Sequence, residues 1–466
     1  MTAEPAEPRD AVFAYVDSPG AGQAMLTAYA FPGTATTAEI TAWITARAAR
    51  IPELRQRMVR VPADLDHPYW VDDPRFAPAR HITFHQPGDW AGLCALQARL
   101  QGEPFDWGRP LWELHVSTGV HGVGGIEGPA TVAGLKIHHA VADGMLSTLI
   151  ARRLFTDELP AALPSTNDRE PSRTALFGRA VAAIPRNLAR LAAAPVAIRT
   201  VRRELKAEQA QGMWTAPAAR RPRTILNEPL GRDRVCDSVF YRFPELRALK
   251  DRIGGVSVND LMLTVVGSAL HSYLAEHGGV PDGSLAAGVP ISTRGAAAAN
   301  ARNQFSLAYV DLHTDIADPI ARTHAIHASM RADQARKLSP ATMKFDMLVN
   351  SIPGFVVRQG LRVLRALPVK RAPTVGGANT LITNVRRGPA DMTLCGLTVA
   401  ATFGVTPLIG EGGIAHSIGS IGDSVAISFT ADPAQLRDAA RYTELLRSSF
   451  AAIEADIYAS TRTEGS

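Results

Sequence analysis

The most informative hydrophobic pattern lies between residues 131 and 154. Residues 131–139, TVAGLKIHH, are almost continuously apolar, which is typical of a buried strand. Beyond Gly144 the apolar residues recur at intervals of three and four, as on one face of an amphipathic helix. They are Leu146, Leu149, Ile150 and Leu154. The pattern predicts a strand that turns directly into a helix.

Capping signals predict further helices in both halves of the chain. TTAE at 36–39 has a threonine followed three residues later by a glutamate, the pattern of a capping box. In SVND at 257–260, the serine is placed to cap a helix that ends at Gly278 and Gly279. Strands are predicted at 286–292 and 423–430, and a last amphipathic helix from Asp432 and Pro433. Helices and strands mix in both halves, so we expect an α/β or α+β fold.

Two kinds of segment interrupt this pattern. Residues 157–172 shift abruptly to proline, serine and charged residues, which indicates a domain boundary. Residues 173–206 carry seven arginines and one lysine against a single glutamate, and predict a basic amphipathic helix broken near Pro185 and Pro195. A similar basic segment lies at 355–371. We therefore divide the chain into a first domain at 1–160, a helical linker or crossover at 161–215, and a second domain at 216–466.

The composition is that of a globular protein with anionic partners. Of the 466 residues, 46% are hydrophobic and 20% are charged, and the net charge is +5. No apolar run approaches the roughly 18 residues that span a bilayer. The first ten residues, MTAEPAEPRD, lack the features of a signal peptide. We therefore expect a cytoplasmic protein without a signal peptide or transmembrane helix. Its three widely spaced cysteines predict neither a disulfide nor a zinc site.

The candidate chemistry lies in residues 138–144, HHAVADG. Alternate residues of a strand point to opposite faces, so His138 and His139 diverge and are poorly placed to chelate one metal ion. His139 ends the strand at a turn, where catalytic groups commonly lie, and Asp143 lies at the positive end of the helix dipole. The alternative is that all three residues are structural. The coincidence of four fixed residue types favours a catalytic motif.

HHxxxDG resembles the signature of the CoA-dependent acyltransferase superfamily, which includes chloramphenicol acetyltransferase and peptide-synthetase condensation domains. Further stretches are similar, in order, to blocks of the bacterial wax ester synthase/diacylglycerol acyltransferases. They are HPYWVDDPRF (67–76), RHITFHQPGD (80–89), RPLWELHV (109–116), PRTILNEPLGRDR (222–234), VND (258–260), PISTR (290–294) and TNV (383–385). The resemblance covers roughly residues 10–455. Two features depart from the family pattern: Arg386 stands where a proline is usual, and AMLTAYAF lacks the usual histidine.

The resemblance implies two chloramphenicol-acetyltransferase-like domains with a tunnel between them. His139 matches the catalytic base. Asp143 matches an aspartate that pairs with an arginine to hold the turn, and Arg294 is the expected partner. Supporting positions are His138, Gly144, Asn259, Asp260 and Asn384, and the expected tunnel wall comprises Pro110, Leu111 and Trp112.

The activity implied by the resemblance is transfer of a long-chain acyl group from acyl-CoA to diacylglycerol or a fatty alcohol. A thioester is already activated, so the reaction needs a base for the alcohol, and an imidazole with a pKa of about 6.5 can take that proton. The same imidazole can return the proton to the CoA sulfur. We therefore expect no covalent intermediate, no metal and no cofactor. Peripheral contact between the basic helices and a membrane or lipid droplet is expected, and nucleic-acid binding is not.

Three alternatives to this interpretation are a lipase, a condensation-like enzyme and a catalytically idle lipid-binding protein. AHSIG (415–419) resembles a nucleophile elbow around Ser417, but His416 is the last histidine of the chain, so the order required of a lipase triad fails. A condensation-like enzyme would take its acyl group from a carrier protein, and the PLW, VND and TNV blocks favour the lipid family over it. A catalytically idle lipid-binding protein would share the fold, and the intact His139 and Asp143 argue against it.

Overall fold

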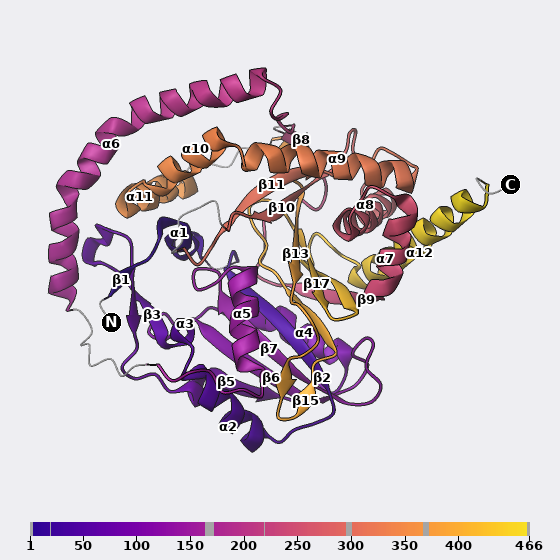
Figure 1. Cartoon of the computed structure of the whole chain (residues 1–466), viewed down its shortest axis with the longest axis horizontal. Coiled ribbons are helices and arrows are strands. Elements are labelled where there is room, and N and C mark those ends of the chain that lie inside the picture. The colour runs from indigo at the N-terminus through magenta and orange to yellow at the C-terminus, as the bar shows by residue number, and fades with distance from the viewer. Residues whose placement is uncertain are drawn as a thin grey trace.

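Two mixed β-sheets, each covered by helices, form the framework of the protein (Figure 1). The computed structural model describes residues 3–18, 20–163, 172–218, 220–294, 301–366 and 372–463. The predicted mixed α/β class is therefore confirmed. One long helix, α6 (Arg173–Ala210), arches around the outside of both halves.

The first half is built on a five-stranded sheet in the order β16-β2-β7-β6-β5. Its central strand, β7 (Ala130–His138), is buried along its whole length. This explains the continuous apolar run, and it buries Lys136, whose Nζ lies 3.0 Å from Glu113 Oε2. The other strands of this half are β2 (Ala24–Pro32), β6 (Trp112–Val120) and β5 (Ile82–His85). The helices are α2 (Thr37–Ala48), α4 (Trp90–Gly102) and α5 (Gly144–Leu154).

The second half is built on a six-stranded sheet in the order β11-β10-β13-β17-β18-β9. Helix α8 (Val258–His277) packs between this sheet and two other helices and is buried over most of its length. The strands are β9 (Val235–Arg242), β10 (Ala286–Ser292), β11 (Phe305–Asp311), β13 (Thr380–Arg386), β17 (Ile414–Ile421) and β18 (Ser424–Ala431). The two other helices are α9 (Pro319–Lys337) and α12 (Ala439–Thr463).

One strand crosses from the second half into the first sheet. β16 (Ala401–Val405) pairs antiparallel with β2, from Ala401 opposite Ala30 to Val405 opposite Leu26. The preceding hairpin, β14 (Thr393–Leu394) with β15 (Leu397–Thr398), packs its Leu394 into the first core. The domain boundary placed at residue 216 from the sequence therefore does not separate the two sheets completely, since β16 of the second part belongs to the sheet of the first.

The remaining elements are short, with the exception of four helices. They are β1 (Glu4–Pro5), α1 (Pro8–Val16), α3 (Pro52–Arg55), β3 (Gln56–Val59), the 3₁₀ helices Pro62–Asp64 and Pro78–His81, β4 (Tyr69–Asp72), β8 (Arg220–Pro222), α7 (Phe243–Ile253), α10 (Pro340–Asn350), α11 (Gly354–Ala366) and β12 (Thr374–Gly376).

Most of the predicted elements are confirmed. The predicted start of the last helix is wrong, and so are the breaks predicted in the basic helix at 173–206. The capping boxes at Thr36 and Ser257 are both present. The last helix begins at Ala439 instead of Asp432, because the Asp432 carboxylate accepts from the backbone N–H groups of Gly231 and Ala434 while Asp438 caps the helix through Arg441 N.

Helix α6 is continuous, so the predicted breaks at its prolines are also wrong. Pro185 and Pro195 both lie inside the helix. Each proline removes one hydrogen bond, and an exposed helix can absorb the loss by bending, as the arch in Figure 1 shows. Of the segment predicted at 355–371, residues 354–366 form α11, and residues 367–371 lie outside the described part of the chain.

The expectation of no membrane-spanning helix needs correction for one element. Among the described residues, α6 is long and apolar enough to cross a membrane by length and composition, and most of it is exposed. The bent pair α7 and α8 passes the same test only if it is counted as one span, and α8 is a core helix. An exposed helix that lies on a surface has the same composition, so this finding alone is weak support for a span.

Candidate active site

His139 lies at the junction of the two halves, directly after β7. Its backbone N–H donates to Gln23 O at 2.8 Å. Its ring stacks on Phe13 of α1, with 4.0 Å between ring centroids and 9° between the planes. Phe305, the first residue of β11, lies 5.7 Å away on a tilted plane. Aromatic rings from both halves therefore hold the imidazole in one orientation.

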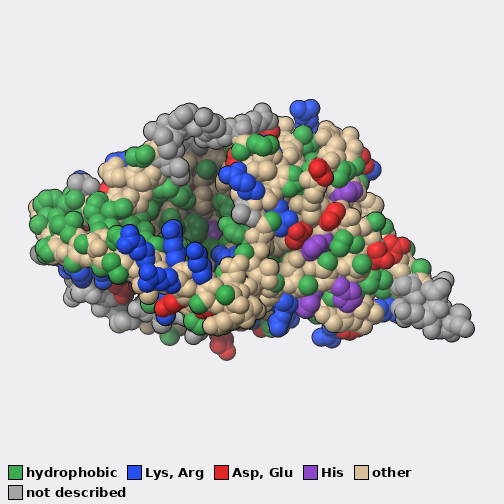
Figure 2. Space-filling view, turned by 90° about the horizontal axis from the view of Figure 1, so that it is seen from above, with side chains coloured by type: hydrophobic (Ala, Val, Ile, Leu, Met, Phe, Trp, Pro, Cys, Tyr) green, Lys and Arg blue, Asp and Glu red, His purple; other side chains and the backbone are tan. Residues whose placement is uncertain are grey.

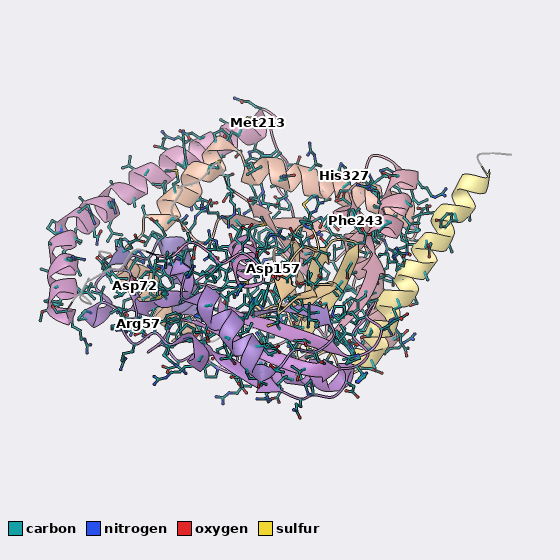
Figure 3. All side chains as sticks on the ribbon, turned by 60° about the horizontal axis from the view of Figure 1, so that its bottom comes forward. Arg57, Asp72, Asp157, Met213, Phe243 and His327 are labelled. Carbon is teal, nitrogen blue, oxygen red and sulfur yellow. The ribbon has the colours of Figure 1, made fainter. Side chains whose placement is uncertain are left out.

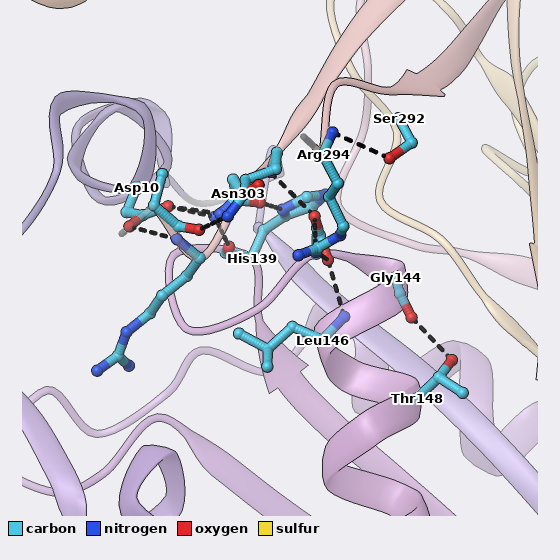
Figure 4. Close-up of polar contacts among 12 residues, drawn as sticks. Asp10, His139, Gly144, Leu146, Thr148, Ser292, Arg294 and Asn303 are labelled. Atoms are coloured by element: carbon cyan, nitrogen blue, oxygen red, sulfur yellow. Dashed lines mark hydrogen bonds and ion pairs between the residues drawn. The ribbon is translucent and has the colours of Figure 1, made fainter. Parts of the chain in front are cut away.

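A side-chain amide from the second half contacts both the ring and the backbone of His139 (Figure 4). Asn303 Oδ1 lies 2.8 Å from His139 Nδ1, and Asn303 Nδ2 donates to His139 O at 2.9 Å. The same Nδ2 donates to Asp10 Oδ1 at 2.8 Å. Asp10 also accepts from the backbone N–H groups of Asn303 at 2.9 Å and Arg302 at 3.1 Å. Asp10 and Asn303 are 1% and 2% exposed.

Burial sets the protonation of this cluster. It lowers the pKa of His139 to about 4, although the hydrogen bond to Asn303 acts in the opposite direction. Burial also raises the pKa of Asp10 to about 6, against the lowering effect of its hydrogen bonds from Asn303 and Arg302. At neutral pH the imidazole is therefore neutral and able to accept a proton, while the carboxylate is largely ionised.

Asp143 holds the turn that follows His139. Its Oδ1 accepts from Leu146 N at 2.8 Å, which caps α5. Arg294 Nη2 lies 2.6 Å from both carboxylate oxygens, and Gln304 N donates to Oδ2 at 3.0 Å. The expected pairing of Asp143 with Arg294 is thus present, and it joins the first half to the second. Asn303 and Gln304 are consecutive residues that contact His139 and Asp143, respectively.

Gly144 and the two asparagines mark where β13 meets the turn. A Cβ atom at Gly144 would lie 2.7 Å from Val385 Cγ2, so the strand that crowds this position belongs to the second half. Next to Val385, Asn384 Nδ2 donates to Asn259 Oδ1 at 2.8 Å. The structure therefore pairs Asn384 with Asn259, while the next residue of β13, Val385, packs against Gly144.

His138 points away from His139, as its place in the strand predicts. It is fully buried, and its Nδ1 accepts from Ala140 N at 3.1 Å. Its Nε2 lies 3.8 Å from Asp17 Oδ2, and its ring packs edge-on against Phe105 and Trp107. These contacts hold the backbone of the turn, which agrees with a supporting position.

Four of the predicted site residues lie elsewhere. Asp260 completes the capping box of α8 and contacts His327 Nδ1 at 2.8 Å. Leu111 and Trp112 are fully buried in the first core, where Trp112 stacks on His81. Pro110 and Trp112 border a separate pocket with Arg80 and His85. A place in a tunnel wall stays a prediction for Pro110, Leu111 and Trp112, since the contacts seen here are with the first core and with this pocket.

A cavity of about 250 Å³ lies next to the residues that surround His139, although His139 itself is not among those that line it. Its walls include Phe13, Asn303 and Phe305, all of which contact the imidazole. The other lining residues mix apolar with polar or charged side chains: Val12, Leu307 and Val349 with Arg9, Ser306, Asp346 and Asn350. In the described part of the chain, the side-chain hydrogen bond of the His139 ring is made through Nδ1, to Asn303. A neutral imidazole can act as a general base on a hydroxyl group that is bound within hydrogen-bonding distance of its second ring nitrogen.

Sequence reasoning missed four of the residues around the base: Asp10, Phe13, Asn303 and Phe305. RDAVF (9–13) and RNQF (302–305) each carry one polar and one aromatic member of the cluster, yet neither segment has a recognisable pattern in isolation. In the described part of the chain, no group of three or more His, Cys, Asp or Glu side chains could hold a metal ion.

Comparison with known proteins gives consistent matches over most of the chain. The sequence model of the wax ester synthase/diacylglycerol acyltransferase catalytic domain matches residues 7–262, and the model of the WS/DGAT C-terminal domain matches residues 302–454. A Mycobacterium tuberculosis protein named as a diacylglycerol O-acyltransferase is 27% identical over 448 residues, covering 92% of this chain and 86% of its own. A second such protein from the same species is 32% identical over 297 residues, or 61% of each chain.

Solved structures match the fold over nearly the full length. The wax ester synthase/diacylglycerol acyltransferase from Marinobacter aquaeolei VT8 matches with a TM-score of 0.66 at 19% identity, covering 97% of this chain and 99% of its own. The first condensation domain of the calcium-dependent antibiotic synthetase matches with a TM-score of 0.56 at 15% identity, covering 97% and 95%. At these identities the structures show a shared fold of two chloramphenicol-acetyltransferase-like domains.

Proposed function

This chain belongs to the wax ester synthase/diacylglycerol acyltransferase family, and from that premise we propose that it moves a long-chain acyl group from acyl-CoA to a lipid alcohol with His139 as the general base. The acceptor is diacylglycerol, a fatty alcohol, or both. The main support is the neutral imidazole of His139, held at the junction of the halves by Phe13, Asn303 and Phe305, three residues that also line a cavity.

The reaction follows from the geometry of one imidazole. Nε2 takes the proton of the acceptor hydroxyl as its oxygen attacks the thioester carbonyl, and the C–O bond forms. Collapse of the tetrahedral intermediate breaks the C–S bond, and the imidazolium returns the proton to the leaving sulfur. Ester and CoA thiol are the products, and the histidine ends in its starting state, so no covalent enzyme intermediate is needed.

Asp143 and the asparagines have positioning and binding roles in this proposal. The Asp143–Arg294 pair keeps the turn that carries His139 fixed across the two halves. Asn384 and Asn259 are hydrogen-bonded to each other near this turn, and an amide N–H directed to the carbonyl oxygen would stabilise the oxyanion.

We further propose that the protein acts at an anionic lipid surface through α6. Eight of its residues are arginine or lysine against two glutamates, and its large apolar side chains Phe177, Val181, Leu188 and Val196 are exposed. Figure 2 shows the exposed apolar side chains gathered at one end of the molecule, with a row of Lys and Arg side chains beside them. A lipid acceptor dissolves in such a surface, so peripheral contact would bring enzyme and acceptor together.

The proposed reaction is tested by CoA release from palmitoyl-CoA with diacylglycerol or hexadecanol, for the wild type and His139→Ala. Loss of the base should lower acceptor-dependent CoA release by about 10²- to 10⁴-fold. The matched control is His416→Ala, since His416 is also buried but contacts Tyr442, away from the cavity. The ratio of triacylglycerol to wax ester identifies the preferred acceptor.

Two outcomes would overturn the proposal. If the folded wild type released no CoA but accepted an acyl group from a carrier protein, the condensation-like alternative would replace it. If it bound palmitoyl-CoA and transferred nothing, it would be an idle lipid-binding protein on this fold.

A further inference from the structure

The hydrogen bonds around Asn303 fix the orientation of its side-chain amide. Nδ2 lies 2.8 Å from Asp10 Oδ1 and 2.9 Å from the backbone oxygen of His139. Both of those oxygens only accept at neutral pH, so the –NH₂ group must face them. The amide oxygen is then left facing the imidazole, as Figure 4 shows.

This orientation determines which ring nitrogen of His139 carries the hydrogen. An amide oxygen cannot donate, so His139 Nδ1 must carry the hydrogen that bridges the 2.8 Å contact. A neutral imidazole has one such hydrogen, and Nε2 therefore keeps its lone pair. Only this tautomer can accept a proton from a substrate at Nε2.

Asp10 anchors the amide from the first half of the chain. Two of its three hydrogen bonds come from Asn303, one from the backbone N–H and one from the side chain, and the third comes from Arg302 N. Both groups are almost fully buried, so water does not compete for these contacts. If the amide rotated by 180°, its oxygen would face the Asp10 carboxylate, which is repulsive.

We propose that Asn303, anchored by Asp10, is a positioning residue that keeps the hydrogen of His139 on Nδ1 and the lone pair on Nε2. The other charged or titratable groups around His139 and Asp10 are Asp143, Arg294, His138 and Arg302. Arg302 is held separately, by its stacking on Trp70 and a hydrogen bond to Gln56. The kinetic test of this proposal rests on the proposed function, whereas the NMR test of the His139 tautomer does not.

The direct test is NMR of the protein labelled with ¹⁵N- and ¹³Cε1-histidine, with the His139 signal assigned from its absence in His139→Ala. The wild type should show hydrogen on Nδ1. Asn303→Ala should lose that preference and lower the pKa of His139, because the protonated ring loses an acceptor. Asp10→Asn combined with Asn303→Asp moves one negative charge next to the ring and should raise that pKa.

Kinetics provide the second readout. Asn303→Ala should lower kcat by about 10- to 1000-fold, since a histidine in the wrong tautomer loses up to about 10⁴ in other catalytic sites, while the KM for palmitoyl-CoA stays within about threefold. The acid limb of the kcat/KM profile should move to lower pH in Asn303→Ala and to higher pH in the charge-moving double variant. A purely structural role predicts neither of these opposite shifts.

The matched control is Asn227→Ala. Asn227 is also fully buried and also donates to backbone oxygens, but its partners, Asn379 and Glu411, lie in the second half. In the folded fraction of Asn227→Ala, His139 should keep the hydrogen on Nδ1. An Asn303→Ala variant with the same tautomer, pKa and kcat as the wild type would overturn the proposal. A wild type without CoA release would overturn the proposed function instead, while the NMR result would still decide the role of Asn303.

Discussion

At the scale of single residues, sequence reasoning found the residues that share one motif and missed those that meet it in space. His139, Asp143 and Gly144 belong to one motif, and Arg294 could be predicted because the family resemblance implies an arginine partner for Asp143. Asn303 and Asp10 are 293 residues apart, and each is an ordinary polar residue until folding joins them. Contact distances of this kind cannot be inferred from one sequence.

Gly144 gives a prediction about the contact between the halves. Its Cβ position lies 2.7 Å from Val385 Cγ2, so Gly144→Ala should overpack the junction and lower the free energy of unfolding by about 1–3 kcal/mol. Denaturant unfolding would measure this. Val385→Ala in the same molecule should recover most of the loss, since it removes the clashing methyl group.

Gly178→Ala is the control for this substitution. Gly178 also lies in a helix, but nothing lies within 4 Å of its Cβ position. The change should therefore be neutral or stabilising by up to about 1 kcal/mol. Equal destabilisation by both substitutions, or no recovery with Val385→Ala, would contradict the packing argument.

At the scale of elements, periodicity and capping chemistry predicted most helices and strands. β7, α5, α8 and β10 agree with the pattern because local signals and tertiary packing favour the same structure. The breaks predicted in α6 are wrong because a proline weakens a helix without always ending it. The start predicted for α12 is wrong because Asp432 binds Gly231, which is distant in the chain.

Helix α6 carries the prediction about lipid binding. Phe177, Val181, Leu188 and Val196 follow one another at helical spacing along one side, and Arg199, Arg203 and Lys206 continue that line. In Figure 3 side chains project from α6 along its length, and Met213 lies just beyond its end. The line thus offers apolar groups for insertion and cations for lipid phosphates.

Changing Arg199, Arg203 and Lys206 to Gln should weaken binding to phosphatidylglycerol-containing vesicles by about tenfold or more, because each cation near an anionic surface contributes on the order of 1 kcal/mol. Vesicle co-sedimentation at low and high salt would measure this. The charge-matched control changes the exposed arginines 242, 247 and 252 around α7 to Gln. If both variants lost vesicle binding equally, binding would depend on the net charge of the protein and not on α6.

At the scale of the whole molecule, buried histidines make stability depend on pH. Burial lowers the pKa of His139 to about 4 and that of His416 to about 3. Both rings remain neutral in the fold where they would charge in the unfolded chain, so the stability they contribute is lost as pH falls from about 6.5 toward 4. Asp10 acts in the opposite direction, because its pKa is raised to about 6, but it is one group against two.

The free energy of unfolding should therefore fall by a few kcal/mol between pH 6.5 and 4, at about 1.4 kcal/mol per pK unit for each histidine. Urea unfolding at half-unit pH intervals would measure this. His416→Gln should flatten the slope, and Asp10→Asn should steepen it. A stability that is constant or rises over this interval would contradict the assignment of neutral buried rings.

The strand that crosses between the halves has a consequence for biosynthesis. A ribosome releases β2 early, yet the strand that covers its free edge, β16, lies some 370 residues later. At about 5–20 residues per second, that edge waits roughly 20 to 75 seconds for its partner. During this interval the nascent first half exposes unpaired backbone groups and the apolar surface that Phe403 later covers. We therefore expect the nascent first half to be prone to aggregation until β16 is made, so that completion of the sheet that carries His139 depends on the last quarter of the chain.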